Sequence, residues 1–229
     1  MSRAKALPFL LALVAVGCRN QADSGEDLSF IRTPDASYLP MVRPENLLPL
    51  RAGAHWTFQV QSDKKILGEE EQRVVRADAR GGTIETIQNG KVVQTETYRL
   101  SPKGIEIVAT GVGAVQTLSP PLFLVRFPIE EERVDSWQGT AGKGAKTFTG
   151  QAWSRVTRRE TVTTPAGTFA AWRVETRTLL TQGDRQELAY IIRWMTPDIG
   201  IVRQKIMTPS GAMIKYLKKL PEVETTGVK

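Results

Sequence analysis

The sequence is poor in the residues that most often bind metals or act as nucleophiles. Its 229 residues include one cysteine, Cys18, and one histidine, His55. A single cysteine excludes an internal disulfide, and the pair cannot supply a zinc site built from several Cys and His ligands. No serine-centred elbow, phosphate-binding glycine loop or dinucleotide fingerprint occurs. We therefore expect no catalytic residue, no metal site and no cofactor, and we predict that the protein is not an enzyme.

The remaining titratable groups point to solvated surfaces. His55 precedes the alternating residues Trp56 and Phe58 and shares the opposite face with Thr and Gln residues, so we expect a surface imidazole. Acidic runs occupy 69–71 and 130–132. Neighbouring carboxylates in an extended chain point in different directions, which favours solvation over a paired acid–base site, although a site built only from carboxylates stays open.

Long apolar runs are absent after the first sixteen residues. Arg3 and Lys5 precede an apolar run over 6–16, which Gly17 and Cys18 follow. This order is typical of a bacterial secretory signal peptide, and the run is shorter than the roughly 20 residues of a membrane-spanning helix. We predict that residues 1–17 are a signal peptide that is removed.

The end of that segment, AVGC at residues 15–18, resembles the lipobox of bacterial lipoproteins. The resemblance implies that Cys18 receives a diacylglyceryl group and anchors the protein in a membrane. Ala15 stands where lipoboxes usually carry Leu, and the ending also fits ordinary signal peptidase, so a freely secreted protein is the alternative. Arg19 follows the cysteine instead of Asp, which by resemblance to enterobacterial sorting favours the outer membrane, facing the periplasm.

The chain carries a net charge of +7. A solvated basic surface and attraction to anionic lipid headgroups are both open interpretations. Nucleic acid is an unsuitable partner for an exported protein without an Arg-rich helix. If the segments that flank the turn at Pro165 pair, their basic residues form a patch for a lipid headgroup or another anionic partner: Arg155, Arg159, Arg173 and Arg177.

The chain divides into a tether and one domain. Residues 18–45 are polar and proline-punctuated, which predicts a flexible tether after the lipidated cysteine; residues 46–220 form the domain and residues 221–229 a disordered tail. Period-two alternation and turn signals such as Asn89-Gly90 recur along the domain. They predict an all-β fold: a single curved antiparallel sheet, a half-barrel or open barrel, of about ten strands in meander order. The segment 190–195 is apolar at both alternations, so we expect it to be covered on both faces.

Four segments along the domain together carry a family resemblance: LPLRAGAHWTF at 48–58, FPI at 127–129 with Trp137, VTTPAGTF at 162–169, and WMTPDIGIV at 194–202. They resemble uncharacterised bacterial envelope proteins with P-L-x-x-G-x-x-W, P-A-G-T-F and W-x-x-P-x-x-G-x-V signatures. The resemblance implies an all-β domain, with a curved sheet like that of the lipoprotein carriers LolA and LolB, and no catalytic residues.

A concave sheet offers a place for a ligand. The stretch 120–128 is the most apolar internal segment, and we interpret it as a buried closing segment or the lip of a cavity. Aromatic residues are mostly core, but in a curved sheet some of them can line a pocket, and the candidates are Trp56, Phe123, Phe127, Trp172 and Trp194. We therefore expect a non-enzymatic binding module for an apolar or lipid-like ligand. The alternative is a structural or protein-interaction lipoprotein that docks on another envelope component.

Overall fold

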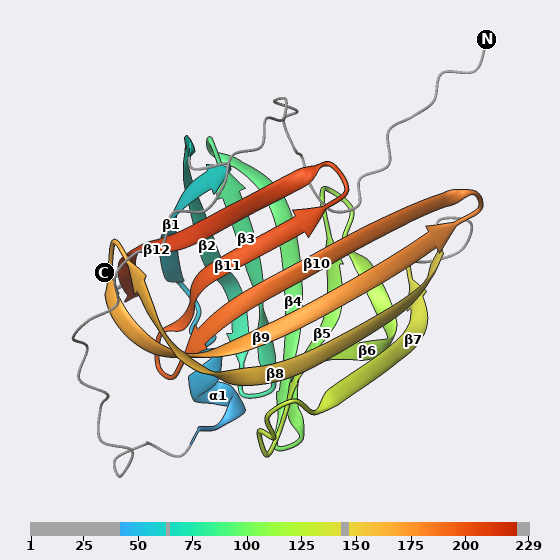
Figure 1. The fold of residues 1–229 in the computed structure, drawn as a ribbon, viewed down its shortest axis with the longest axis horizontal. Coiled ribbons are helices and arrows are strands. Elements are labelled where there is room, and N and C mark those ends of the chain that lie inside the picture. Colours follow the sequence, from blue (N-terminus) through green and yellow to red (C-terminus); the bar gives the residue numbers. More distant parts are fainter. Residues whose placement is uncertain (1–41, 63–64, 143–146, 224–229) are drawn as a thin grey trace, which may run out of the picture.

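The computed structural model describes residues 42–62, 65–142 and 147–223, and these form twelve antiparallel strands in a closed barrel. Each strand pairs with its neighbours along the chain, and β1 also pairs with β12, so the sheet closes on itself (Figure 1). A short helix, α1 (Pro44–Leu47), precedes the strands. These are β1 (Ala54–Ser62), β2 (Lys65–Asp78), β3 (Gly81–Gln88), β4 (Lys91–Ser101), β5 (Gly104–Gly111), β6 (Gln116–Arg126), β7 (Val134–Ala141), β8 (Phe148–Thr164), β9 (Gly167–Gln182), β10 (Arg185–Thr196), β11 (Gly200–Thr208) and β12 (Gly211–Val223).

The predicted signal peptide, Cys18 and nearly all of the predicted tether lie outside the described residues. Helix α1 starts within the last two residues of the predicted tether, and β12 extends to Val223, three residues into the predicted tail. Residues 224–229 also lie outside the described part.

Short turns set the register of the meander. Asn89 and Gly90 join β3 to β4 with φ of 52° and 71°, and two successive positive φ values suit the right-handed twist of a tight hairpin. Gly183 (φ 57°) and Asp198 (φ 66°) occupy the turns after β9 and β10. The Asn89-Gly90 turn lies where the sequence predicted it, and the strand order confirms the antiparallel meander.

Two features of the predicted fold were wrong. The barrel is closed instead of half-open, and it has twelve strands instead of about ten. The missing strands lie over 119–160, where the signal is weak: β6 continues through Pro120 and Pro121, and β7 buries only Trp137 and Ala141. Closure depends on the pairing of β1 with β12, which lie at opposite ends of the domain and have no local sequence signature.

Alternation sorts the side chains into an inner and an outer face of the barrel wall. The inner face carries the main core, which includes Phe58, Leu217, Val174 and Met195, all at most 1% exposed. At 190–195 the outer face is covered too, because Ile192 and Trp194 are buried there; the predicted two-sided coverage is confirmed.

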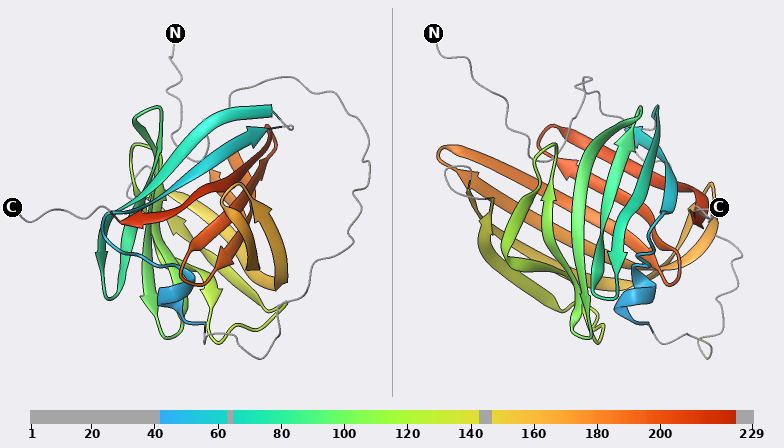
Figure 2. Two further views of the ribbon diagram at one scale, coloured as in Figure 1. Left: turned by 90° about the vertical axis from the view of Figure 1, so that its left-hand side faces the viewer. Right: turned by 180° about the vertical axis from the view of Figure 1, so that it is seen from behind.

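One end of the barrel is covered by α1 and by two turns (Figure 2). The amide of Asp198 donates to Asn46 O at 2.7 Å, and Trp56 Nε1 donates to Ile199 O at 2.6 Å, so the β10–β11 turn packs on α1 and β1. The amide of Ala166, in the β8–β9 turn, donates to Leu217 O at 3.1 Å. The P-A-G and W-x-x-P-x-x-G motifs therefore form the turns that pack on this end of the barrel.

A polar layer crosses the barrel interior. Lys215, Gln204 and Arg193 are successive cross-strand neighbours on β12, β11 and β10, and each is at most 5% exposed. Lys215 forms an ion pair with Glu70, and Arg193 reaches Glu96 on β4, 3.4 Å away across the barrel. Because β4 and β10 are not adjacent in the barrel, side chains from the two strands meet only across the interior. The contact between Arg193 and Glu96 therefore identifies the inner face. The layer separates the main core from a small apolar cluster formed by Ala189, Ile191, Ile206 and Met213.

The wall is weakest between β6 and β7. Only two residue pairs connect them, Leu118 with Ala141 and Ser119 with Thr140. Beyond these, side chains bridge the strands: Trp137 Nε1 donates to Pro120 O at 2.7 Å. The described residues therefore leave the backbone of β7 without a strand partner on this side over 134–139.

Candidate functional site: a groove on the outer face of β7 to β10

A groove of about 560 Å³ lies on the outer face of four neighbouring strands. The register arranges its lining side chains in two cross-strand rows. Ser136, Trp153 and Arg177 form one row on β7, β8 and β9; the next row comprises Gln138, Gln151, Leu179 and Leu188. Trp137 and Ala152 complete the lining between these rows. The residues of both rows alternate along their strands with residues of the main core, so the rows lie on the outer face; Trp137 and Ala152 belong to that core and border the groove between the rows.

Trp153 and Tyr190 stand on either side of β9 and lean toward each other. Their rings lie 6.0 Å apart between centroids at an interplanar angle of 53°, although they come from strands that are not adjacent. Edge-tilted aromatic pairs of this kind add about 0.5–1.5 kcal/mol beyond their buried area. Trp153 lines the groove, so the pair lies at the edge of the groove.

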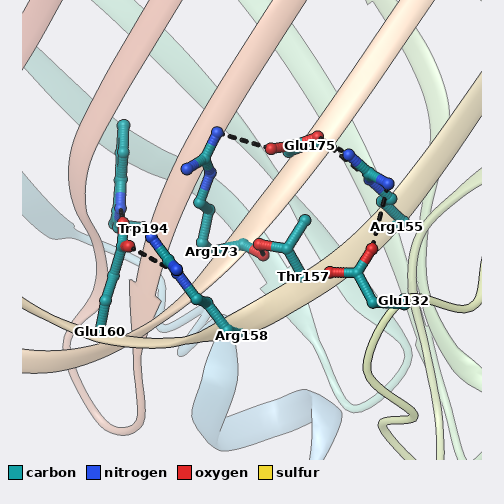
Figure 3. Close-up of polar contacts among 8 residues, drawn as sticks. All are labelled: Glu132, Arg155, Thr157, Arg158, Glu160, Arg173, Glu175 and Trp194. Atoms are coloured by element: carbon teal, nitrogen blue, oxygen red, sulfur yellow. Dashed lines mark hydrogen bonds and ion pairs between the residues drawn. The ribbon is translucent and has the colours of Figure 1, made fainter.

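An ionic network lies next to this pair on the outer face. It is centred on Glu175 of β9, whose side chain is 3% exposed. Glu175 accepts hydrogen bonds from Arg155 Nε and Nη2, at 3.1 and 3.0 Å, and Arg173 Nη2 lies 2.6 Å from its other oxygen. Arg155 also reaches Glu132 at 3.0 Å, so the charges alternate along the row (Figure 3). The network joins β8 to β9 and holds both guanidinium groups in place.

Protonation of the network follows from these contacts. Burial alone would raise the pKa of Glu175, but hydrogen bonds from Tyr190 and Arg155 and the charges of Arg173 and Arg155 outweigh it, so this pKa is lowered. Burial and the hydrogen bond to Glu175 raise the pKa of the Tyr190 hydroxyl. Glu175 is therefore an ionised acceptor and Tyr190 a neutral donor at physiological pH.

Arg177 differs from Arg155 and Arg173, the arginines of the neighbouring ionic network. Its side chain is exposed at the groove, and no carboxylate of the described residues lies within ion-pair distance of it. Arg173, on the same strand as Arg177, and Arg155, on the neighbouring strand β8, both have carboxylate partners. The groove thus combines an apolar wall with one unpaired cation.

The predicted basic patch is split by a β-bulge. Arg155, Arg173 and Arg177 share the outer face, but the register of β8 shifts between Val156 and Arg159. The one extra residue moves Arg159 to the opposite face, where its guanidinium lies 5.3 Å from the centre of the Trp172 ring. Sequence alternation without the bulge cannot predict this change of face.

The five aromatic residues predicted to bind a ligand do not form one site. Trp56 lies in the core under the β10–β11 turn, while Trp194 lies on the outer face and donates from Nε1 to Glu160. Phe123 packs beneath Arg126, Phe127 packs against the core, and Trp172 is paired with Arg159. None of the five lines the groove. The apolar stretch near Pro120 lies mostly in β6, where Leu122, Leu124 and Val125 are buried; it does not close the sheet, since closure is between β1 and β12.

His55 lies on the outer face of β1, away from the groove. Its side chain is 23% exposed, and Nε2 is 3.8 Å from Glu222. In the described ranges, no group of three or more His, Cys, Asp and Glu side chains is arranged to hold a metal ion. No helix in the part of the chain that the structure describes is long and apolar enough to cross a bilayer.

Part of the chain matches a family model. Residues 141–217, about a third of the sequence, match the DUF3108-like family. The matched range extends from the end of β7 into β12 and includes the groove residues Trp153, Arg177, Leu179 and Leu188. No curated protein matches the chain.

Two solved structures are similar to the chain. One is a Bacteroides fragilis protein inferred to be exported and described as having a YmcC-like fold; it has 18% identity, 76% coverage of this chain, 98% coverage of its own and a TM-score of 0.48. The other is a Parabacteroides distasonis protein inferred to be a lipoprotein, with 15% identity, coverages of 76% and 97%, and a TM-score of 0.46.

Proposed function

We propose that this chain is an outer-membrane-anchored, non-enzymatic lipoprotein of the cell envelope that binds an apolar or lipid-like ligand. The observation that carries the proposal is the groove of about 560 Å³ with Trp153, Leu179 and Leu188 in its lining. Its volume lies in the range of about 300–1,000 Å³ that is usual for small-molecule sites. The likeness to LolA and LolB stays a prediction.

The groove is a better candidate than the barrel interior. The predicted concave site placed Trp and Leu side chains inside the sheet, but the inner face carries the packed core and the polar layer around Arg193 and Lys215. On the outer face, Leu179 and Leu188 are only partly buried, so a ligand that covers them would remove further apolar area from water.

A direct test is native mass spectrometry of the full chain carrying Cys18→Ser, exported and purified without detergent. We expect a co-purifying adduct of lipid mass on the protein, and we expect Leu179→Asp to abolish it. Val75→Asp is the matched control, because Val75 is an exposed apolar strand residue on β2, which contributes nothing to the groove lining. An adduct that survives Leu179→Asp, or a bare mass throughout, contradicts the proposal.

The membrane anchor rests on the first eighteen residues. Labelled palmitate should enter the wild-type protein and not the Cys18→Ser variant, since the thiol would form the thioether to the lipid. Equal labelling of both proteins, or labelling of neither, removes this part of the proposal without affecting the groove.

The absence of enzymatic activity is likewise a proposal. It is supported by the position of His55, which has Glu222 as its acidic neighbour and no contact with the groove lining. Turnover of any metabolite that is lost on substitution of a groove residue would contradict it.

A second candidate function is docking on another envelope component. The observation that favours it is the edge of β7, which has no strand partner over 134–139 among the described residues. An extended segment of a partner can add to such an edge. A photo-crosslinking residue at Ser136 should then yield one discrete envelope adduct that the same residue at Lys91, the first residue of β4, does not yield.

A further inference from the structure

We infer that the groove takes an anionic amphiphile, in which Arg177 holds a carboxylate or phosphate head group while Trp153, Leu179 and Leu188 contact an apolar chain. This inference deepens the proposed function and rests on it. It names the chemical class of the ligand and the residue that selects it.

The first step is the isolation of Arg177. It is the single charged residue in the groove lining of the described chain. Its guanidinium is exposed and no described carboxylate neutralises it, so five N–H donors are available to an incoming anion. Guanidinium groups match carboxylate and phosphate oxygens in a bidentate geometry.

The second step is the neutralisation of the neighbouring cations. Arg155 lies 3.0 Å from both Glu132 and Glu175, and Arg173 lies 2.6 Å from Glu175. The lowered pKa of Glu175, which the hydrogen bonds and charges of its neighbours cause against the effect of burial, keeps this carboxylate ionised. Among Arg155, Arg173 and Arg177, the cation whose charge remains available to a ligand in the groove is therefore Arg177.

The third step is the layout of the lining. Arg177 and Leu179 are two residues apart on β9, so their side chains stand about 6.6 Å apart along one face. Leu179 pairs with Leu188 across the strands, which extends the apolar surface away from the cation. The other polar lining residues, Ser136, Gln138 and Gln151, are neutral hydrogen-bonding groups, so no acidic group of the lining repels an anion.

These features distinguish an amphiphile from its two nearest alternatives. A wholly polar anion would leave the faces of Leu179 and Leu188 in contact with water, and a neutral lipid would leave the Arg177 guanidinium without an ionic partner. A single molecule with one anionic end and one apolar chain satisfies both parts of the groove.

The test compares ligands that share one chain and differ in the head group. Dodecanoate, dodecyl phosphate, dodecanol and dodecyltrimethylammonium are titrated below their micelle concentrations into the full chain with Cys18→Ser, and calorimetry measures the dissociation constants. Inorganic phosphate is a further arm. We expect both anionic ligands to bind about tenfold tighter than dodecanol, the factor that one charge-assisted hydrogen bond brings, and inorganic phosphate to bind far more weakly.

Variants then assign the preference to one residue. Arg177→Ala should remove the preference for the anions, so that dodecanoate and dodecyl phosphate bind no tighter than dodecanol binds to the same variant, and Arg177→Lys should retain part of the preference. Arg76→Ala is the matched control, since Arg76 is an exposed strand arginine on β2 without an ion pair among the described residues.

The outcomes separate this inference from the proposed function. If dodecanol binds as tightly as dodecanoate, or if Arg177→Ala keeps the anionic preference, the inference is overturned while lipid binding stands. If inorganic phosphate binds as tightly as dodecyl phosphate, the apolar chain has no role and the amphiphile is excluded. If no dodecyl compound binds, the proposed function fails together with the inference.

Discussion

Replacing Glu175 with glutamine should weaken the fold and loosen the border of the groove. The substitution keeps the shape of the side chain but removes the negative charge that Arg155, Arg173 and Tyr190 share. A hydrogen bond to a buried charged group contributes about 1.5–3 kcal/mol, but the side chains of Arg155 and Arg173 are 35% and 27% exposed, so water recovers part of each interaction. We expect a loss of about 2 kcal/mol in the free energy of unfolding, which lowers the melting temperature by about 4–8 °C.

Urea denaturation at neutral pH measures this loss. The matched control is Glu71→Gln, because Glu71 pairs with Arg73 at 2.8 Å on a more exposed surface, where side-chain exposures are 33% and 41%. An exposed pair of this kind contributes about 0–1 kcal/mol. If both variants lose the same stability, the network around Glu175 does not contribute as described.

The pH dependence provides an independent check. The folded-state pKa of Glu175 is lowered, because hydrogen bonds and neighbouring guanidinium charges outweigh the opposing effect of burial. Its contribution to stability is therefore fully present above the unfolded-state pKa of about 4.3 and is lost as the pH falls through the lower folded-state value. The difference in unfolding free energy between wild type and Glu175→Gln should be constant from about pH 6 to 8 and shrink below about pH 4. A difference that grows on acidification would refute the reasoning.

Two further stability predictions follow from the barrel itself. Lys215→Met should cost about 3–5 kcal/mol because it leaves Glu70 buried without its partner, and a second substitution, Glu70→Leu, should restore most of the loss; a double-mutant cycle in urea measures both steps. Gly81→Ala should cost about 3 kcal/mol or more, since strain at φ of +148° adds to the clash of a new Cβ that would lie 2.0 Å from Tyr98 O. Gly90→Ala, with open space around it, should cost only about 1–2 kcal/mol, so similar melting temperatures for the two variants would contradict this.

Much of the fold could be predicted from local patterns. Alternation over 54–62 and turn residues such as Asn89-Gly90 are properties of short segments, and the structure confirms the antiparallel meander. The signal failed over 119–160, where β6 contains two prolines, which are rare in strands, and β7 buries few residues. In a strand that is only partly paired and buries few side chains, apolar and polar residues need not alternate. The sequence of such a strand therefore gives little sign that it is a strand.

The candidate site could be predicted only in part. The basic residues Arg155, Arg173 and Arg177 were placed on one face correctly, because their spacing along the paired strands is even. Arg159 was not, since a bulge changed its face. The pairing of Leu179 with Leu188 could have been predicted, because the turn around Gly183 places them opposite each other. The position of Gln151 beside Leu179 could not, because it depends on the register of a third strand, β8.

The amino-acid sequence by itself determined the strand and turn chemistry and the scarcity of cysteine and histidine, because each is a property of residue type or of a few neighbouring residues. Tertiary structure decided the closure of the barrel and the polar layer from Arg193 to Glu96. It also decided the groove and the isolation of Arg177 from every carboxylate described. These features depend on strands that are far apart in the chain, and their registers are set jointly by twist, bulges and packing, which no local segment encodes.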